Sequence, residues 1–225
     1  MSRMKCILKY LLTRPWIARR LLALSLWTHN ISYWASGFFA SIVEADGLHP
    51  KHRLMNYHQW FMDHLRPEWR VLDVGCGNGA LALDLSRCCK EVVGIDMSER
   101  SLQQAKQRAP QIRFIQGDAV QFVKKNQEGF DAVVLSNILE HVEARVDFLK
   151  NLSRVSPCLL IRVPMINRDW ITLYKKERGL EWRLDRSHYT EYTIESFRSD
   201  LEQSGLTLFQ YDIRFGEIYA VCYKK

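Results

Sequence analysis

The sequence predicts an α/β fold in which a seven-stranded, mostly parallel sheet ends in a C-terminal antiparallel hairpin and is preceded by a helical N-terminal segment. From Arg70 onward, short apolar runs alternate with segments of helical period, as in a parallel sheet with crossover helices. Near the end of the chain, LTLFQYDIR and EIYAVCYKK flank a Phe-Gly pair, which is the pattern of a hairpin. We therefore divide the chain into a helical segment over residues 1–54 and an α/β domain over residues 55–225.

The strands and helices of this domain can be assigned in order along the chain. The predicted strands are residues 70–74, 91–95, 112–116, 130–135 and 158–163, followed by the two runs of the hairpin. The predicted helices are residues 79–88, 99–108, 119–125, 143–154 and 194–204, the last ending before the C-cap glycine Gly205. A long polar and aromatic insertion separates the fifth strand from the last helix.

Composition and charge limit the classes of function. The 225 residues are 47% hydrophobic and 25% charged, as in a globular protein, and the six cysteines form no zinc pattern and read as free thiols of a reducing, cytoplasmic compartment. Residues 1–70 hold ten Lys and Arg against four Asp and Glu, a charge of +6, whereas residues 71–225 hold 22 against 21, a charge of +1. Basic patches attract nucleic acid or anionic membranes. The nearly neutral α/β domain argues against nucleic acid as its partner.

The N-terminal segment contains an uncharged stretch over residues 21–43, which is long enough for a bilayer crossing of about 20 residues. Polar residues in its middle, Thr28-His29-Asn30, disfavour a spanning helix. Apolar residues recur at helical spacing near the N-terminus, at Ile7, Leu8, Leu11 and Leu12. Residues 1–45 are expected to make peripheral contact with an anionic membrane, or to form a lid or an ordinary amphipathic helix.

A glycine-rich loop, Gly75-Cys76-Gly77-Asn78-Gly79, joins the first strand to a helix. Glycines let the backbone turn tightly and let a ligand approach the main chain, so a nucleotide-like cofactor is predicted over this loop. The spacing of Gly75, Gly77 and Ala80 also fits the dinucleotide fingerprint, which leaves a nicotinamide enzyme as an alternative.

Three acidic residues follow three successive strands and favour another cofactor. Asp73 precedes the loop, where a carboxylate suits an ammonium group better than a pyrophosphate. Asp96 could accept hydrogen bonds from both ribose hydroxyls, and Asp118 from an adenine amine. The set suits a cofactor that carries ribose, adenine and a zwitterion but no phosphate.

The segments VLDVGCGNGALALDLS, VVGIDMS, QGDA and FDAVVLSNILEHV resemble the successive motifs of the class I S-adenosylmethionine-dependent methyltransferases, over roughly residues 55–225. The strings LEHV and DRSHY are similar to those of the subgroup that includes ubiquinone-biosynthesis O-methyltransferases and small-molecule or sugar O-methyltransferases. The resemblance implies a Rossmann-like fold, S-adenosyl-L-methionine as the cofactor and a small-molecule acceptor. It assigns roles to eight positions: Gly75, Cys76, Gly77 and Asn137 near the methionine part, Asp96 and Met97 at the ribose and the adenine edge, and Asp118 and Ala119 at the adenine ring. With Asp73, assigned above from its charge, these are the predicted cofactor-binding residues.

Methyl transfer to a hydroxyl needs a base, and His141 and His188 are the candidates, with structural roles as the alternative. Some relatives bind a divalent metal through a further glutamate at the position of Asn137. Because that glutamate is absent, no metal is predicted, although Glu140, His141 and His188 could bind one loosely. Glu140 is otherwise expected to orient a neighbour or to act as a helix N-terminal acid.

The insertion over residues 166–192 is the predicted acceptor wall, since its aromatic and charged side chains suit sugars or flat rings: Trp170, Tyr174, Trp182, Arg183 and Tyr189. The acceptor is expected to be a hydroxyl of a sugar or glycan precursor, or of a phenolic or lipid-linked compound. An amine acceptor, an RNA methyltransferase and a non-catalytic S-adenosylmethionine-binding protein remain alternatives. The oligomeric state is not predicted.

Overall fold

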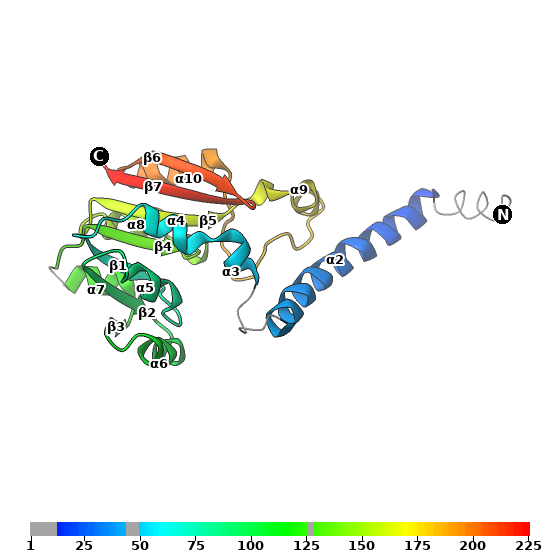
Figure 1. Cartoon of the computed structure of the whole chain (residues 1–225). Helices are drawn as coiled ribbons and strands as arrows, with labels where there is room; N and C mark the ends of the chain where they lie inside the picture. Colours follow the sequence, from blue (N-terminus) through cyan, green and yellow to red (C-terminus); the bar gives the residue numbers. More distant parts are fainter. Residues whose placement is uncertain (1–12, 44–49, 126–127) are drawn as a thin grey trace. The chain divides into compact units, whose positions relative to one another are not determined.

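The computed structural model describes residues 13–43, 50–125 and 128–225 (Figure 1). The chain divides into two compact units, Met1–Leu54 and Met55–Lys225. In the first unit, helix α2 (Pro15–Val43) covers most of the described residues. The apolar residues at positions 7, 8, 11 and 12 lie outside the described part of the chain. Among the described residues, no helix combines the length and apolar character that a membrane crossing requires.

The second unit is built on one seven-stranded sheet with the order β3-β2-β1-β4-β5-β7-β6. The first five strands pair in parallel, and β7 lies antiparallel between β5 and β6. The strands are β1 (Arg70–Val74), β2 (Glu91–Asp96), β3 (Arg113–Gln116), β4 (Ala132–Ser136), β5 (Cys158–Pro164), β6 (Leu206–Arg214) and β7 (Glu217–Lys224). The predicted fold class is therefore confirmed, including the C-terminal antiparallel hairpin.

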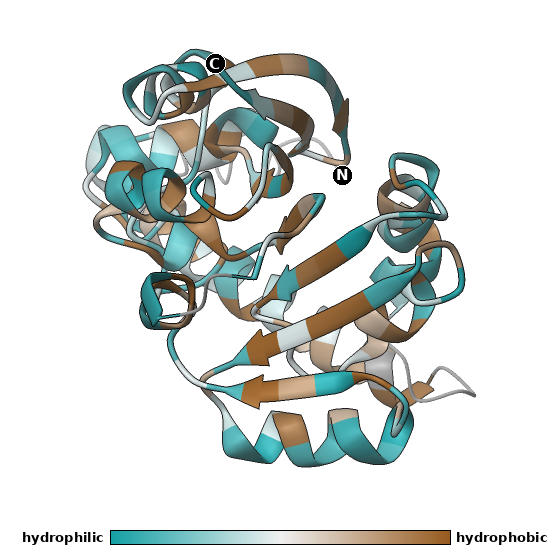
Figure 2. Ribbon diagram, turned by 90° about the vertical axis from the view of Figure 1, so that its left-hand side faces the viewer, coloured by the Kyte–Doolittle hydropathy of each residue, from teal (hydrophilic) through white to brown (hydrophobic). Residues whose placement is uncertain are grey.

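Helices cover both faces of the sheet because successive strand residues point to opposite sides. Val71 packs into the core that holds buried residues of α4, α5 and α6, whereas Leu72 packs into the core of α7, α8 and α10. Figure 2 shows strands that are predominantly hydrophobic, in brown, between helices that are partly hydrophilic. The helices are α3 (Pro50–Met55), α4 (Tyr57–Asp63), α5 (Ala80–Leu85), α6 (Glu99–Arg108), α7 (Ala119–Lys125), α8 (Arg145–Leu152), α9 (Trp170–Glu177) and α10 (Ile194–Gln203), with 3-10 turns η1 (Leu139–His141) and η2 (Ile166–Arg168).

Several boundaries differ from the predicted ones by one to three residues, and two differences, in α5 and in the insertion, have local causes. Helix α5 is shorter than residues 79–88 because Gly79 adopts a left-handed conformation at its start and the N–H of Cys88 bonds to Leu85, three residues back. The insertion after β5 contains helix α9, whose N-terminus is capped by Asp169 through the N–H of Thr172. The short polar run before α9 concealed this helix in the sequence.

Candidate functional site

Most of the predicted functional residues lie at the carboxyl ends of β1 to β4, and β1 and β4 are the two neighbouring strands where the order of the sheet reverses. In doubly wound sheets such a switch point opens a crevice for ligands. The loop over residues 75–79 follows β1, and the segment over residues 137–141 follows β4. These two segments form the two halves of the candidate site.

The glycine loop is held by backbone hydrogen bonds to the neighbouring strand. The N–H groups of Gly75 and Cys76 both donate to the carbonyl of Ile95, at 2.8 and 3.1 Å. Gly75, Gly77 and Gly79 have φ angles of 70°, 51° and 74°, which residues with a Cβ rarely adopt. These hydrogen bonds and glycine φ angles together define the shape of the loop.

The three glycines differ in what surrounds them. A Cβ at Gly75 would lie 2.1 Å from the Cδ1 of Ile138. A Cβ at Gly79 would lie 2.9 Å from the Cβ of Ala105. A Cβ at Gly77 would meet no atom within 4 Å. Gly75 and Gly79 are thus required for packing, whereas Gly77 faces open space, as expected where a ligand approaches the main chain.

Asp73 is a buried carboxylate beneath this loop. Its side chain is 2% exposed, and its Oδ2 has no hydrogen-bond partner among the described residues. Burial, with a smaller contribution from the charge of Asp96, raises the pKa of Asp73 to about 7. A cationic group bound next to Asp73 would stabilise its ionised form.

Asp96 and Asp118 each fix the loop that follows their strand. Asp96 accepts hydrogen bonds from the N–H of Gly77 through Oδ2 and from that of Ser98 through Oδ1, both at 2.8 Å. Asp118 accepts one from the N–H of Gln121 at 2.8 Å, at the start of α7. Both carboxylates keep further lone pairs for a ligand. Of their predicted neighbours, Met97 is 74% exposed and Ala119 is buried.

Asn137 follows β4 with a φ of 56°, a left-handed conformation that is uncommon for a residue with a side chain. Its N–H donates to the carbonyl of Arg162 at 2.9 Å, and its buried Oδ1 has no partner within the described structure. An acceptor oxygen in this state is costly to bury unless a donor is supplied from elsewhere. Asn137 thus has the properties of a ligand-binding residue.

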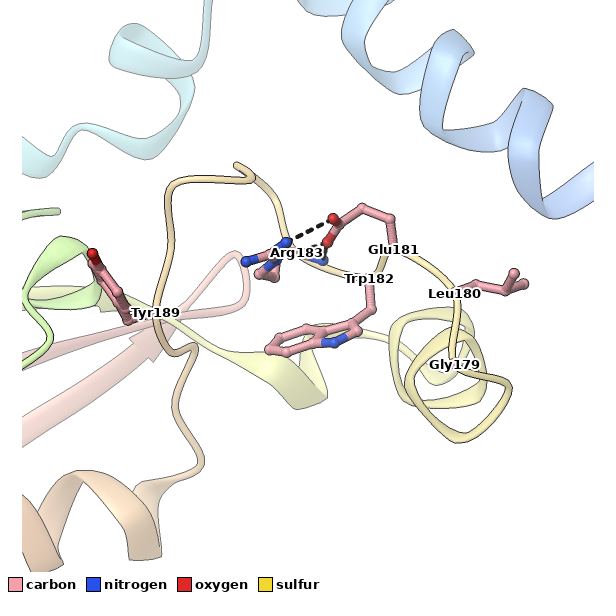
Figure 3. A pocket seen from close by; sticks show the side chains of 6 residues that line it. All are labelled: Gly179, Leu180, Glu181, Trp182, Arg183 and Tyr189. Carbon is pink, nitrogen blue, oxygen red and sulfur yellow. Dashed lines mark hydrogen bonds and ion pairs between the residues drawn. The ribbon is translucent and has the colours of Figure 1, made fainter.

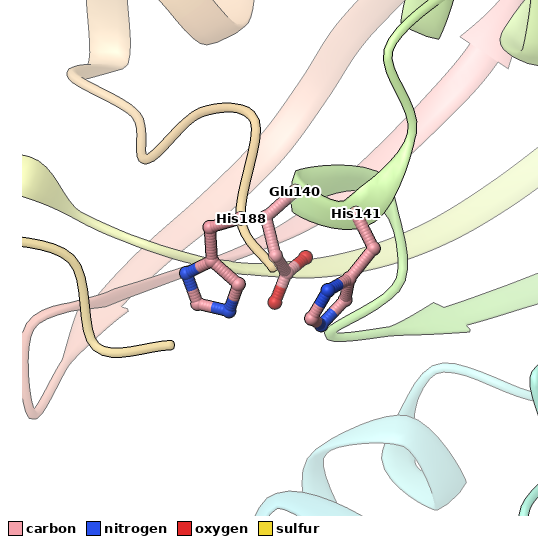
Figure 4. A group of neighbouring side chains, drawn as sticks. All are labelled: Glu140, His141 and His188. Atoms are coloured by element: carbon pink, nitrogen blue, oxygen red, sulfur yellow. The ribbon is translucent and has the colours of Figure 1, made fainter. Parts of the chain in front are cut away.

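The segment after β4 also brings Glu140 between His141 and His188, as Figure 4 shows. One potential ligand atom from each of the three side chains lies within 4.8 Å of the others. Glu140 is fully buried, and neither of its carboxylate oxygens has a partner among the described residues. Burial raises the pKa of Glu140 to about 8. Glu140 lies in the first turn of the 3-10 turn η1, and its role as an N-terminal acid or as an orienting residue stays a prediction.

His188 is buried and held by a second acidic residue, Glu191. The Nδ1 of His188 lies 3.0 Å from Glu191 Oε1, and Glu191 also pairs with Arg168. An Nδ1–H donated to this carboxylate leaves Nε2 as the basic nitrogen of the ring.

His141 is more exposed, with its Nδ1 3.0 Å from the hydroxyl of Ser187. The two rings contact each other edge to face, with centroids 4.7 Å apart, and burial and His188 lower the pKa of His141.

Glu140, His141 and His188 could hold a divalent cation, since one carboxylate and two imidazoles form a common ligand set. The sequence predicts no metal because Asn137 replaces a fourth ligand. The structure brings the other three side chains together.

The insertion reaches this cluster through its backbone, because the N–H of Tyr189 donates to the carbonyl of Glu140 at 2.8 Å. It contains a shallow pocket of about 290 Å³ (Figure 3) lined by Gly179, Leu180, Glu181, Trp182, Arg183 and Tyr189. Arg183 donates to Glu181 through two nitrogens at 2.8 Å and to the carbonyl of His188 at 3.1 Å. Trp170 and Tyr174, also predicted for the acceptor wall, lie on α9 and do not line this pocket.

Sequence reasoning missed three residues that shape the site. Glu191 stands three residues after His188, a spacing that could have indicated the pair. Arg162 and Glu217 form a buried two-bond ion pair between β5 and β7, and Arg162 also donates to Ser136 at the end of β4. No local pattern indicates that pair, because its members are 55 residues apart.

Comparisons with known proteins agree with this geometry. Residues 71–156 match the family described as a methyltransferase domain. The chain is similar to the ubiquinone biosynthesis O-methyltransferases of Bradyrhizobium diazoefficiens, at 29% identity over 61% of this chain and 61% of that protein, and of Saccharomyces cerevisiae (mitochondrial), at 34% identity over 58% and 46%. Each match spans less than two thirds of the relative's length.

Solved structures share the fold at low sequence identity. The magnesium protoporphyrin IX methyltransferase of Synechocystis with bound SAH has 20% identity and a TM-score of 0.60, covering 78% of this chain and 83% of that chain. The N-methyltransferase NodS of Bradyrhizobium japonicum with S-adenosyl-L-homocysteine has 18% identity and a TM-score of 0.57. The match covers 76% of this chain and 86% of that chain. The sheet, the glycine loop and the family match define a methyltransferase domain. Together, the domain match over residues 71–156, the similar O-methyltransferases and the shared fold support a class I S-adenosylmethionine-dependent methyltransferase.

Proposed function

We propose that this chain transfers the methyl group of S-adenosylmethionine to a hydroxyl group of a small acceptor, with a phenolic ring as the favoured class. The favoured class comes from the relatives named as ubiquinone biosynthesis O-methyltransferases. The observation that carries the proposal is the buried His188–Glu191 pair, 3.0 Å apart, next to a switch-point crevice with a glycine loop. A sugar or lipid-linked hydroxyl is the other acceptor class that the aromatic insertion suits.

The cofactor fits the unsatisfied polar groups beside the glycine loop and at Asn137. Asp73 Oδ2 is a buried acceptor suited to the ammonium group of the methionine part, and Asn137 Oδ1 is a second acceptor nearby in the fold. Asp96 would receive the ribose hydroxyls, with Met97, Asp118 and Ala119 around the adenine. When bound, S-adenosylmethionine supplies an electrophilic methyl group on a sulfonium.

The second half of the site provides the base that accepts the hydroxyl proton of the acceptor. As the acceptor oxygen bonds to the methyl carbon and the carbon–sulfur bond breaks, the hydroxyl proton passes to Nε2 of His188. Glu191 keeps the imidazole in the required tautomer and stabilises its protonated form. S-adenosylhomocysteine and the methyl ether leave, and the proton on His188 returns to solvent. The exposed His141 is the alternative base.

Product analysis tests this proposal. The protein is incubated with methyl-labelled S-adenosylmethionine and a panel of phenols, catechols, hexoses and primary amines, and the products are identified by mass spectrometry. We expect a labelled methyl ether that requires the hydroxyl and disappears when it is blocked. Labelled products from amines alone would contradict hydroxyl methylation. Failure of S-adenosylhomocysteine to bind, measured by calorimetry, would contradict the cofactor assignment.

A further inference from the structure

We propose that helix α2 lies on the surface of an anionic membrane, with one aromatic face in the headgroup region. The observation that motivates this is an exposed apolar stripe on a helix of 29 residues. The stripe is defined by Trp27, Ile31, Trp34 and Phe38, whose exposed fractions range from 46% to 68%. Large apolar side chains that are this exposed and lie in one row mark an interaction site.

The stripe follows helical geometry. Its four members stand at positions i, i+4, i+7 and i+11, so they share one face. Trp16, eleven residues before Trp27, continues the same face and is 63% exposed. From Trp16 to Phe38 the rise of 1.5 Å per residue gives a row about 33 Å long.

A polar row runs along the opposite face with the same spacing. Ser25, His29, Ser32 and Ser36 each stand two residues before a member of the aromatic stripe. Two residues correspond to about 200° of rotation, which places this polar row opposite the stripe. Large apolar side chains also lie off the stripe, with Phe39 59% and Val43 83% exposed, so the aromatic stripe is the most continuous of several apolar rows on α2. Such a helix can lie in an interface with its polar row toward water.

The charge of the segment identifies the partner as an anionic bilayer. Residues 1–43 contain six Lys and Arg and no Asp or Glu. Arg14, Arg19 and Arg20 lie at the N-terminal end of α2, where the helix dipole already favours anions. Two copies of such a segment would repel each other, whereas anionic headgroups would be attracted. Trp side chains are also enriched where a bilayer meets water.

Vesicle flotation of the full chain tests the proposal. We expect the protein to float with vesicles that contain phosphatidylglycerol but not with phosphatidylcholine alone, and salt should weaken the binding. The Arg19→Gln/Arg20→Gln variant should bind roughly 25-fold more weakly, about fivefold for each cation removed. Equal recovery with both vesicle types, or no binding to either, would overturn the proposal.

Matched variants on the two faces of α2 separate insertion from charge attraction alone. Trp27→Ser/Trp34→Ser should lose binding to the anionic vesicles, whereas Ser25→Ala/Ser36→Ala should bind like the parent. Unchanged S-adenosylhomocysteine affinity would show that both variants are folded. A lipid-free dimer that the tryptophan variant disrupts would overturn the proposal in favour of a second copy. Retention in vesicles after an alkaline carbonate wash would overturn it in favour of a spanning helix.

Discussion

The two halves of the site lie at the same edge of the sheet but are built in different ways. The first half consists of the glycine loop and Asp96, which are close in sequence, and Asp96 accepts a hydrogen bond from the N–H of Gly77. In the cluster after β4, Glu140 and His188 come from distant parts of the chain, and the carboxylate of Glu140 has no partner among the described residues. Both halves hold a buried carboxyl group with an unpartnered oxygen, Asp73 in the first and Glu140 in the second. The halves differ in that local contacts shape the first, whereas segments far apart in the sequence assemble the second.

Substitution in the first half should have the largest effect. Gly77→Val should abolish binding of S-adenosylhomocysteine, because its side chain would fill the open space over the loop and its φ of 51° disfavours a Cβ by roughly 1–2 kcal/mol. Calorimetry measures the binding. The control is Gly129→Ala, since a Cβ there meets no atom within 4 Å. A folded Gly77→Val protein with parental affinity would contradict the placement of the ligand.

The buried carboxyl group in the other half should make stability depend on pH. The pKa of Glu140 is raised from 4.5 to about 8, so the folded protein keeps a proton that the unfolded chain loses. This contribution is fully present below pH 4.5 and is lost as pH rises through about 8. Glu140→Gln should remove this loss of unfolding free energy, which is on the order of 5 kcal/mol at about 1.4 kcal/mol per pKa unit.

Urea unfolding between pH 5 and 9 measures this effect on the free energy of unfolding. The exposed Glu143, three residues further along the chain, provides the matched variant Glu143→Gln, which should behave like the parent. A parallel pH dependence in the parent and Glu140→Gln would show that Glu140 is not the responsible group.

Removal of the Asp96 carboxylate should weaken ligand binding less than a side chain placed over the glycine loop by Gly77→Val. Asp96→Ala should weaken S-adenosylhomocysteine binding by roughly 1.5–3 kcal/mol, the range for hydrogen bonds to a charged group. Asp147→Ala, in which an exposed side chain on α8 is removed, serves as the control. Unchanged affinity of Asp96→Ala in calorimetry would rule out the ribose contact.

The smallest effect concerns the protonation of Asp73. Because the pKa of Asp73 is raised to about 7, its carboxyl group is largely neutral at pH 6 and largely ionised at pH 8. Affinity for the cationic ammonium group of S-adenosylhomocysteine should therefore rise about tenfold over this range, at most tenfold per pH unit. Asp73→Asn should bind weakly at both pH values. A parent affinity that is constant with pH would separate Asp73 from the ammonium group.

The contrast between the two halves also explains which features of the fold and the site the sequence predicted. The glycine loop, the acidic residues after β1, β2 and β3, and all seven strands follow from patterns within a few residues of one another. The contact of Tyr189 with Glu140 and the Arg162–Glu217 pair join segments about 50 residues apart, and no spacing encodes them. The approach of Glu140, His141 and His188 to within 4.8 Å depends on such contacts.

Helix α9 was missed for a related reason. Its residues carry a mixed polar and aromatic pattern that also suits an irregular loop, and the cap of Asp169 on Thr172 was the available local signal. The partner of His188 was not predicted, because the predicted acidic residues all follow strand ends, whereas Glu191 lies in the insertion.

The dependence of the methyl-transfer rate on pH tests the central claim most directly. For the parent, kcat should rise with pH, because a general base must be unprotonated to accept the proton of the acceptor. His188→Ala should lower kcat by roughly 10²–10⁴-fold and abolish this rise, while affinity for S-adenosylhomocysteine changes by less than about 0.5 kcal/mol. Glu191→Gln should shift the rise, and Glu191→Asp should partly restore it. Parental kcat and pH dependence in both His188→Ala and His141→Ala would contradict general-base catalysis by histidine.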